Sequence, residues 1–108
     1  MSTAIEEKVK QILTDPKYST VKAMLEKDHA IDCLFLLLIG KGKWKDAKEF
    51  MQTHKLTLSD GTFRARMIEI ENLGLAKSTR LDPLKKYYTK TEKGEKLAQL
   101  LLELFQKL

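Results

Sequence analysis

The chain has 108 residues, of which 43% are hydrophobic and 32% are charged, and its formal net charge is +5. This length suits one domain with a modest core. The single cysteine excludes an intrachain disulfide, and the longest apolar run, seven residues, excludes a membrane-spanning helix, which needs roughly 18 or more.

The first 27 residues predict two helices. Thr3 and Glu6 form a capping box ahead of an apolar stripe. The first helix should end at Asp15, because the residue before a proline avoids helical geometry, and a second helix is expected from about Ser19. The acidic, polar start is unlike a signal peptide, so we expect a cytoplasmic, nucleoid-associated protein. The apolar stripe consists of Ile5, Val9, Ile12 and Leu13.

Two further helices, joined by a basic turn, are predicted from residue 28 onward. Asp28 is expected to cap a central buried helix through the apolar run Cys33 to Ile39. A buried strand is the alternative for so short a run. Gly40 and Gly42 bracket the turn, and a helix over about residues 44–54 follows. The residues expected to face the core are Ile31, Leu34, Phe35, Leu38, Ala47, Phe50 and Met51.

The segment LSDGTFRARMIEIENLGLA predicts a short amphipathic helix over residues 59–72. Ser59 is a good N-cap, and Gly74 can adopt the left-handed conformation that ends a helix. Phe63, Met67 and Ile70 recur at the spacing of one buried face. A helix with one apolar face and one small, basic face is typical of helices that enter the DNA major groove. The residues largely off the buried face are Thr62, Arg64, Ala65 and Arg66.

The last third of the chain predicts a β-hairpin and a helix. Residues 75–80 and 85–90 are expected to pair as strands, with a turn at Leu81-Asp82-Pro83-Leu84. Thr91 should cap the last helix, which carries more apolar surface than one small domain can cover. We therefore expect a homodimer, with the partner surface supplied by the N-terminal stripe of the same chain or of a second copy. The apolar residues of this helix are Leu97, Leu100, Leu101, Leu102, Leu104, Phe105 and Leu108.

Positive charge gathers in the middle of the chain. Residues 41–90 contain 12 of the 20 Lys and Arg residues but only six of the 15 Asp and Glu residues. Neutralisation of phosphates is the main source of non-specific affinity for DNA. The placement of the charge therefore favours a nucleic-acid partner.

The order helix, helix, turn, helix, hairpin, helix resembles that of winged helix-turn-helix proteins over about residues 28–108. The stretches GTFRARMIEIENLGLAKS, KKYY and TEKGEKLAQLL are similar to the PadR-like group of transcriptional regulators. Small regulators of the MarR superfamily and of archaeal type share the architecture. The resemblance implies a mainly α fold with a small β-hairpin wing (α+β), a DNA-binding domain over 28–90, and dimerisation helices over 1–27 and 91–108.

The resemblance also implies a DNA-binding surface. Arg64 and Arg66 would contact base edges, guanine being the usual arginine target. Ser59 and Thr62 would meet phosphates, as would Lys43, Lys45 and Lys48. The wing residues Lys77, Arg80, Lys85 and Lys86 would contact the backbone or the minor groove. Two copies would contact half-sites of double-stranded DNA about one helical turn apart.

Other interpretations of these residues are weaker. His29 and Cys33 are four residues apart, but a tetrahedral metal site needs four ligands, so we expect no metal and an inert buried thiol. Trp44 is expected to pack in the core rather than stack beside DNA. No nucleophile–base pair or phosphate-binding loop indicates an enzyme, and no pattern indicates a cofactor or an effector. An architectural DNA-coating protein and a winged-helix protein-interaction module are the alternatives.

Overall fold

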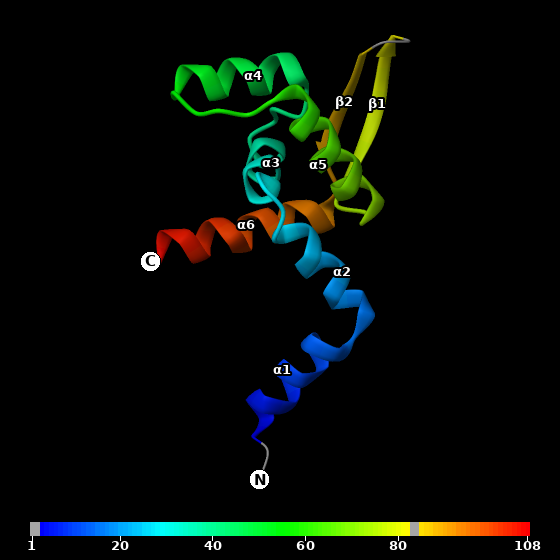
Figure 1. Ribbon diagram of the computed structural model, residues 1–108, viewed down its shortest axis with the longest axis vertical. Helices are drawn as coiled ribbons and strands as arrows, with labels where there is room; N and C mark the ends of the chain where they lie inside the picture. The colour runs from blue at the N-terminus through cyan, green and yellow to red at the C-terminus, as the bar shows by residue number, and fades with distance from the viewer. Residues whose placement is uncertain (1–2, 83–84) are drawn as a thin grey trace.

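The computed structural model describes residues 3–82 and 85–108 (Figure 1). The elements are α1 (Ala4–Thr14), α2 (Pro16–Leu25), α3 (Ala30–Leu38), α4 (Trp44–Thr53), α5 (Asp60–Asn72), β1 (Ala76–Asp82), β2 (Lys85–Lys90) and α6 (Glu92–Gln106). The fold is therefore mainly helical with one antiparallel hairpin, which confirms the predicted α+β class. Among the described residues, no helix is long and apolar enough to cross a membrane.

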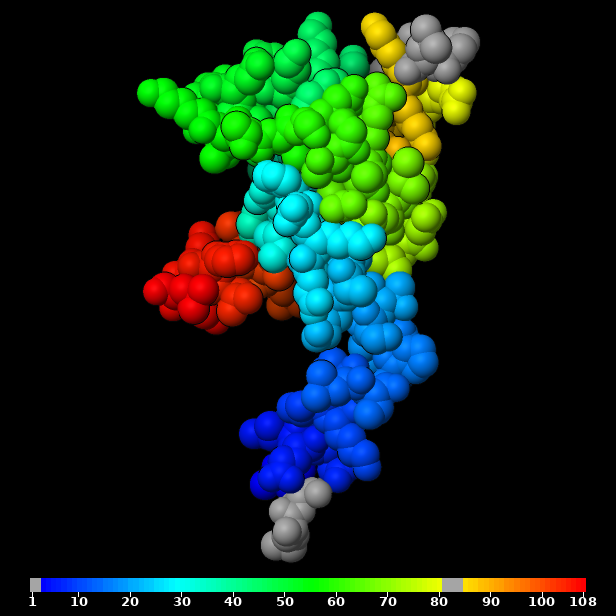
Figure 2. Space-filling model, viewed as in Figure 1, coloured from blue at the N-terminus to red at the C-terminus, as the bar shows by residue number. Residues whose placement is uncertain are grey.

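The molecule is elongated, with extents of 56 × 31 × 22 Å. Helix α1 projects away from the body as an arm, and the C-terminal half of α6 projects to one side (Figures 1 and 2). The body consists of α3 to α6 with the hairpin, and α2 leads from the arm into it. The apolar stripe of α1 does not cover α6 within this chain, since both surfaces are exposed.

Helix α3 lies at the centre of the core. Its residues Ala30, Cys33 and Leu34 are essentially inaccessible to solvent, as are Leu36 and Leu37 one turn later. Because buried positions fall on so much of its surface, α3 packs against several elements at once. The helix prediction for this run is confirmed, and the strand alternative is wrong.

Helix α5 packs its apolar face into the same core. The predicted stripe of Phe63, Met67 and Ile70 is buried, and Ser59 caps the helix by accepting a hydrogen bond from the Thr62 backbone N–H at 3.1 Å. Gly74 ends it with a φ of 75°. These contacts fix which side of α5 is left for solvent.

Two predicted helix starts are wrong. Helix α2 begins at Pro16 rather than near Ser19, because proline fits the first helical position and the Asp15 carboxylate accepts from the Lys17 N–H at 2.9 Å. Asp28 does not cap α3. His29 occupies the N-cap position with a φ of 62°, and no side-chain hydrogen bond caps this helix.

The hairpin pairs β1 with β2 in an antiparallel register, Ala76 opposite Lys90. The register shifts between Arg80 and Asp82. Strand β1 continues through Leu81 and Asp82, where the sequence predicted the start of the turn, and the Pro83-Leu84 part of that turn lies outside the described residues. The turn before α4 is hydrogen-bonded to strand β2, since the Tyr88 N–H donates to the Gly42 carbonyl at 3.0 Å. A Cβ at Gly42 would lie 1.8 Å from the Tyr88 oxygen, so only glycine fits this junction.

Candidate nucleic-acid interface

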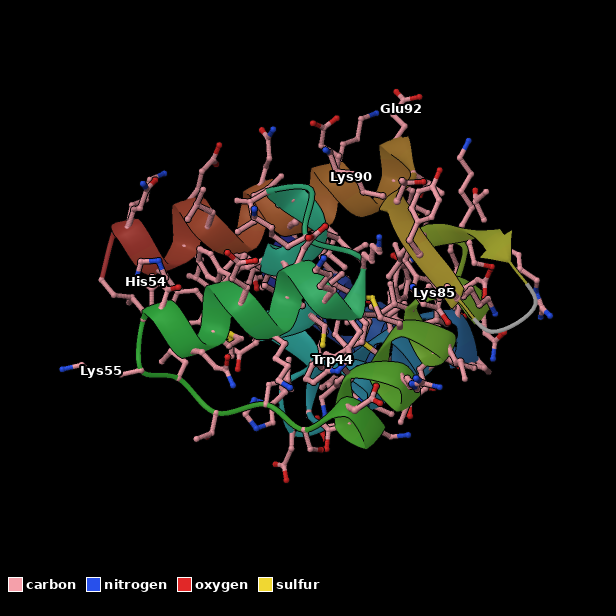
Figure 3. All side chains as sticks on the ribbon, turned by 90° about the horizontal axis from the view of Figure 1, so that it is seen from above. Trp44, His54, Lys55, Lys85, Lys90 and Glu92 are labelled. Carbon is pink, nitrogen blue, oxygen red and sulfur yellow. The ribbon has the colours of Figure 1, made fainter. Side chains whose placement is uncertain are left out.

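A groove of about 580 Å³ opens between the start of α4, the outer face of α5 and the hairpin. In Figure 3, Trp44 lies between α4 and α5, and Lys85 lies on the hairpin beside α5. His54 and Lys55 lie at the far end of α4, away from the groove. The groove is lined by Lys43, Trp44, Lys45, Phe63, Arg64, Ile68, Lys85, Lys86 and Tyr88. Five of these lining residues are basic and none is acidic.

Contacts between α5 and the hairpin position two walls of this groove. The Glu71 carboxylate on α5 accepts from the Ser78 backbone N–H at 3.0 Å and from the Ser78 hydroxyl at 2.6 Å. The other oxygen of Glu71 lies 3.8 Å from the Lys86 ammonium group on β2. A carboxylate with backbone and side-chain donors is a directional anchor, so it sets the angle of the hairpin against α5.

The outer face of α5 carries Gly61, Arg64 and Ile68 at helical spacing. The Arg64 side chain is 64% exposed, and its Nε donates to the Asp60 carboxylate at 2.7 Å. This exposed pair contributes little to stability. The pair holds the guanidinium beside the first turn of α5, and Arg64 is one of the residues that line the groove.

Arg66 lies elsewhere. Its side chain is only 15% exposed, and its guanidinium donates to the Glu69 carboxylate at 3.0 Å and to the Asp28 carbonyl at 3.2 Å. These partners hold Arg66 toward the corner between α2 and α3, so the structure does not bring it together with Arg64. The geometry gives no support to a base contact by Arg66, because the side chain is engaged within the fold.

The remaining predicted residues divide between the groove and its surroundings. Lys43 and Lys45 are among the lining residues of the groove, and they make no ion pair with any residue that the structure describes. Lys48 is exposed on α4, and Lys77 and Arg80 are exposed on β1, outside the lining residues. Ser59 and Thr62 bond to each other within the α5 cap, with the Ser59 hydroxyl donating to the Thr62 oxygen at 2.9 Å.

The site predicted from the sequence did not include the apolar residues that line this groove. Trp44 packs against the core as expected, with its ring 5.3 Å from that of Phe63, yet it also lines the groove. Ile68 is 47% exposed although it is apolar, and Tyr88 closes the groove from β2. The position of Ile68 four residues after Arg64 was the pattern that placed it on the same face.

The cysteine site contains no metal-binding arrangement. Cys33 is fully buried, and burial, together with the negative charge of Asp32, raises its pKa from 9.0 to about 12 although Arg66 acts in the opposite direction. The His29 Nδ1 lies 2.9 Å from the Asp32 carboxylate, at the surface. Within residues 3–82 and 85–108, no three His, Cys, Asp or Glu residues gather where they could hold a metal ion.

Comparisons with known proteins show a shared fold. No protein-family model matches the sequence, and no curated protein matches it. Among solved structures, the chain is similar to the X-ray structure of a PadR-like transcription factor from Bacteroides fragilis, with a TM-score of 0.65 and 22% sequence identity. The likeness covers 81% of this chain and 89% of that one. At this identity it establishes the fold, and the expected winged-helix architecture is confirmed.

Proposed function

We propose that this protein is a PadR-like transcriptional regulator that binds double-stranded DNA with α5 in the major groove. The observation that carries the proposal is a groove lined by five basic residues and by no acidic residue. These basic residues come from the start of α4, from α5 and from β2. Such a surface attracts phosphates, and its central helix has the size that the major groove admits. The fold shared with a PadR-like transcription factor supports the same function.

The position of each side chain suggests its role. Arg64, exposed on the outer face of α5, is the candidate for a base edge, most often guanine. Lys43 and Lys45 would bind phosphates beside the groove, and Lys85 and Lys86 would bind the flanking backbone from the hairpin. Ser59, Thr62, Lys48, Lys77 and Arg80 stay candidates for further phosphate contacts around this centre. We assign Arg66 a structural role instead.

We also propose that the protein acts as a homodimer through its terminal helices. Ile5 of α1 is 73% exposed and Leu100 of α6 is 63% exposed, and each belongs to an apolar stripe without cover in the single chain. Apolar surface of this extent is typical of an interface. A second copy would bury both stripes and place two α5 helices on one DNA duplex.

A salt-titrated binding experiment tests the proposed function. Duplexes of about 30 base pairs are selected from a random pool by binding, and their affinity is compared with that for scrambled duplexes between about 50 and 200 mM salt. We expect the affinity for both kinds of duplex to fall steeply as the salt concentration rises. We also expect the selected duplex to bind about a thousandfold or more tightly than the scrambled one. A steep salt dependence with equal affinity for both duplexes would indicate an architectural DNA-binding protein. The absence of binding at about 50 mM salt would exclude a DNA partner.

The variant Arg64→Ala tests the placement of α5. Loss of a bidentate base contact should weaken binding to the selected duplex by about 1–3 kcal/mol and relax preference at one base pair. The control is Lys96→Ala, which removes an exposed positive charge from the polar face of α6. Equal effects of the two variants on the selected duplex would contradict a specific role for Arg64.

A further inference from the structure

The junction between α2 and the body has little apolar packing. Of the residues of α1 and α2, all of which the structure describes, only Met24 is buried. Leu25 packs against the same core but is only partly buried. Apolar contact is non-directional. These few contacts alone would therefore permit a range of angles between the N-terminal helices and the body (Figure 1).

A polar cluster crosses this junction. It consists of Lys27, just beyond the end of α2, and of Arg66 and Glu69 on α5, and we call it the corner cluster. The Lys27 ammonium group lies 3.2 Å from the Glu69 carboxylate, which accepts from the Arg66 guanidinium at 3.0 Å. Arg66 also donates to the Asp28 carbonyl at 3.2 Å. Hydrogen bonds are directional, so this cluster specifies an angle that apolar contact leaves open.

The backbone at this corner is itself constrained. His29 has a φ of 62°, a conformation that is unfavourable for residues other than glycine and persists where surrounding contacts enforce it. The Asp28 carbonyl belongs to the peptide bond directly before His29, so the hydrogen bond from Arg66 holds that peptide plane. The His29 Nδ1 also lies 2.9 Å from the Asp32 carboxylate in the first turn of α3. Helix α5 therefore helps to hold the turn that joins α2 to α3.

We propose that the corner cluster is a positioning device that sets the separation of the two α5 helices in the dimer, and thereby the spacing of the DNA half-sites that the protein binds. The inference rests on the proposed DNA-binding dimer. In that dimer a second copy would cover the exposed stripe of α1, whereas α5 and the stripe of α6 belong to the body. The chain passes from α1 into the body through the corner between α2 and α3. The angle at this corner would then decide where α5 lies relative to the second copy.

The fit to DNA is sensitive to this geometry. One base pair changes the separation of two half-sites by about 3.4 Å and rotates one half-site about the duplex axis by roughly 35°. A dimer with a fixed corner fits one spacing, and a dimer with a loose corner fits several. A partly buried ionic cluster suits this role, because such groups can specify one arrangement even where apolar residues would give equal stability.

A distance between the two copies tests the device without DNA. A nitroxide label at Gln52→Cys, on an exposed position of α4, reports the separation of the two bodies by pulsed electron spin resonance. Cys33 is fully buried, so it stays unlabelled. We expect a narrow distance distribution in this parent protein and a broader one after Arg66→Lys, because an ammonium group lacks the planar fork that bonds Glu69 and Asp28 together. The same distribution in both proteins would overturn the inference.

Two lysine variants provide a matched comparison. Lys27→Ala removes a contact between the corner and α5, whereas Lys22→Ala removes an ion pair with Glu26 that lies along one helix. Both substitutions delete one positive charge at a side chain that is roughly half exposed. We expect Lys27→Ala to broaden the distance distribution and Lys22→Ala to leave it unchanged. Equal effects of the two variants would indicate a general effect of charge and would exclude the corner cluster.

Duplexes with altered spacing then test the effect on DNA binding. The half-sites of the selected duplex are moved by one base pair, and a duplex with a single half-site is the reference. All proteins are compared at a temperature at which circular dichroism shows them to be folded. We expect the altered spacing to weaken binding of the parent by about tenfold and binding of Arg66→Lys by less than about threefold. Affinity for the single half-site should agree within about twofold.

The outcomes separate this inference from the proposed function. Weaker binding of Arg66→Lys to every duplex, with the spacing preference kept, would overturn the positioning role alone. A labelled parent without a distance between copies would contradict the dimer and the inference with it. A dimer that binds no DNA would contradict the proposed function, while the distance distributions would still decide whether the corner cluster fixes the geometry of the dimer.

Discussion

At the scale of single residues, Gly61 and Gly42 have opposite surroundings. A Cβ at Gly61 would meet nothing within 4 Å, and its φ is not in the left-handed region, so the fold does not require glycine there. A Cβ at Gly42 would collide with the Tyr88 backbone. Gly61 lies in the first turn of α5, on the face that we propose contacts DNA, where the absence of a side chain would permit close approach of a phosphate.

The variant Gly61→Ala should therefore have effects of opposite sign on stability and on DNA binding. We expect the free energy of unfolding to rise by about 0.4–1 kcal/mol in urea melts, because alanine restricts the unfolded chain. Affinity for the selected duplex should fall, since the methyl group would separate α5 from the DNA. An unchanged affinity for DNA in Gly61→Ala would show that Gly61 is not part of the interface. Gly42→Ala is the contrasting variant, with an expected loss of stability of about 1–3 kcal/mol.

Cys33 provides a prediction about pH. Its folded-state pKa is about 12, raised by burial and by Asp32, whereas an exposed thiol titrates at 9.0. Above pH 9 the unfolded state loses the thiol proton while the folded state keeps it, so this group destabilises the fold as the pH rises toward 12. Relative to Cys33→Ala, the wild-type protein should lose stability with a slope approaching about 1.4 kcal/mol per pH unit. Equal slopes from urea melts at pH 8 to 11 would contradict a buried thiol.

At the scale of elements, a small polar cluster fastens α5 to the corner between α2 and α3. Glu69 accepts from Arg66 at 3.0 Å and lies 3.2 Å from the Lys27 ammonium group, while Arg66 also bonds to the Asp28 carbonyl. One further nitrogen of Arg66 and one oxygen of Glu69 are buried without a hydrogen-bond partner in the described part of the chain. Removal of Arg66 would leave Glu69 with Lys27 as its remaining partner, and removal of Glu69 would leave Arg66 with the Asp28 carbonyl.

Two arginine variants on one helix should thus separate folding from binding. Arg66→Ala should lower the free energy of unfolding by about 1–3 kcal/mol, because it removes the hydrogen bonds to the Glu69 carboxylate and to the Asp28 carbonyl. Arg64→Ala should change it by less than about 0.5 kcal/mol, because its pair with Asp60 is exposed. Chemical melts of both variants measure this difference. An unchanged free energy of unfolding in Arg66→Ala would contradict a structural role for Arg66.

At the scale of the whole molecule, the elongated shape presents two exposed apolar stripes. Val9 on α1 and Leu104 on α6 are about half exposed, and neither stripe packs against the other in the chain. The end of α6 is held to α3 by an edge-to-face contact between Phe35 and Phe105, at 6.1 Å between ring centroids. The remaining apolar surface of α6 is therefore held in a fixed position and exposed to solvent, where the proposed second copy would cover it.

Charge placed in either stripe should dissociate the proposed dimer. Val9→Glu and Leu104→Glu should each convert a species of twice 12.5 kDa into one of 12.5 kDa in sedimentation experiments, because burial of an unpaired carboxylate is costly. Gln99→Glu, on the polar face of α6, is the control and should leave the mass unchanged. A wild-type protein that sediments at 12.5 kDa would contradict the dimer.

Several features of the fold follow from local chemistry and were predicted from the sequence alone. Thr3, Ser59 and Thr91 cap helices because a hydroxyl at that position satisfies a free backbone N–H nearby in the chain. The buried stripe of α5 and the two strands of the hairpin follow from periodicity and residue preference. The basic character of residues 41–90 is likewise a property of the sequence.

Only the tertiary structure decided which side chains share a surface. Arg64 and Arg66 are equivalent in the sequence pattern, yet packing of α5 turns one outward and holds the other against Glu69 and Asp28. The groove likewise joins Trp44, Ile68 and Tyr88 from three distant elements. Helical periodicity defines the face of one helix, but contacts between elements depend on how helices and strands dock, which local preferences do not specify.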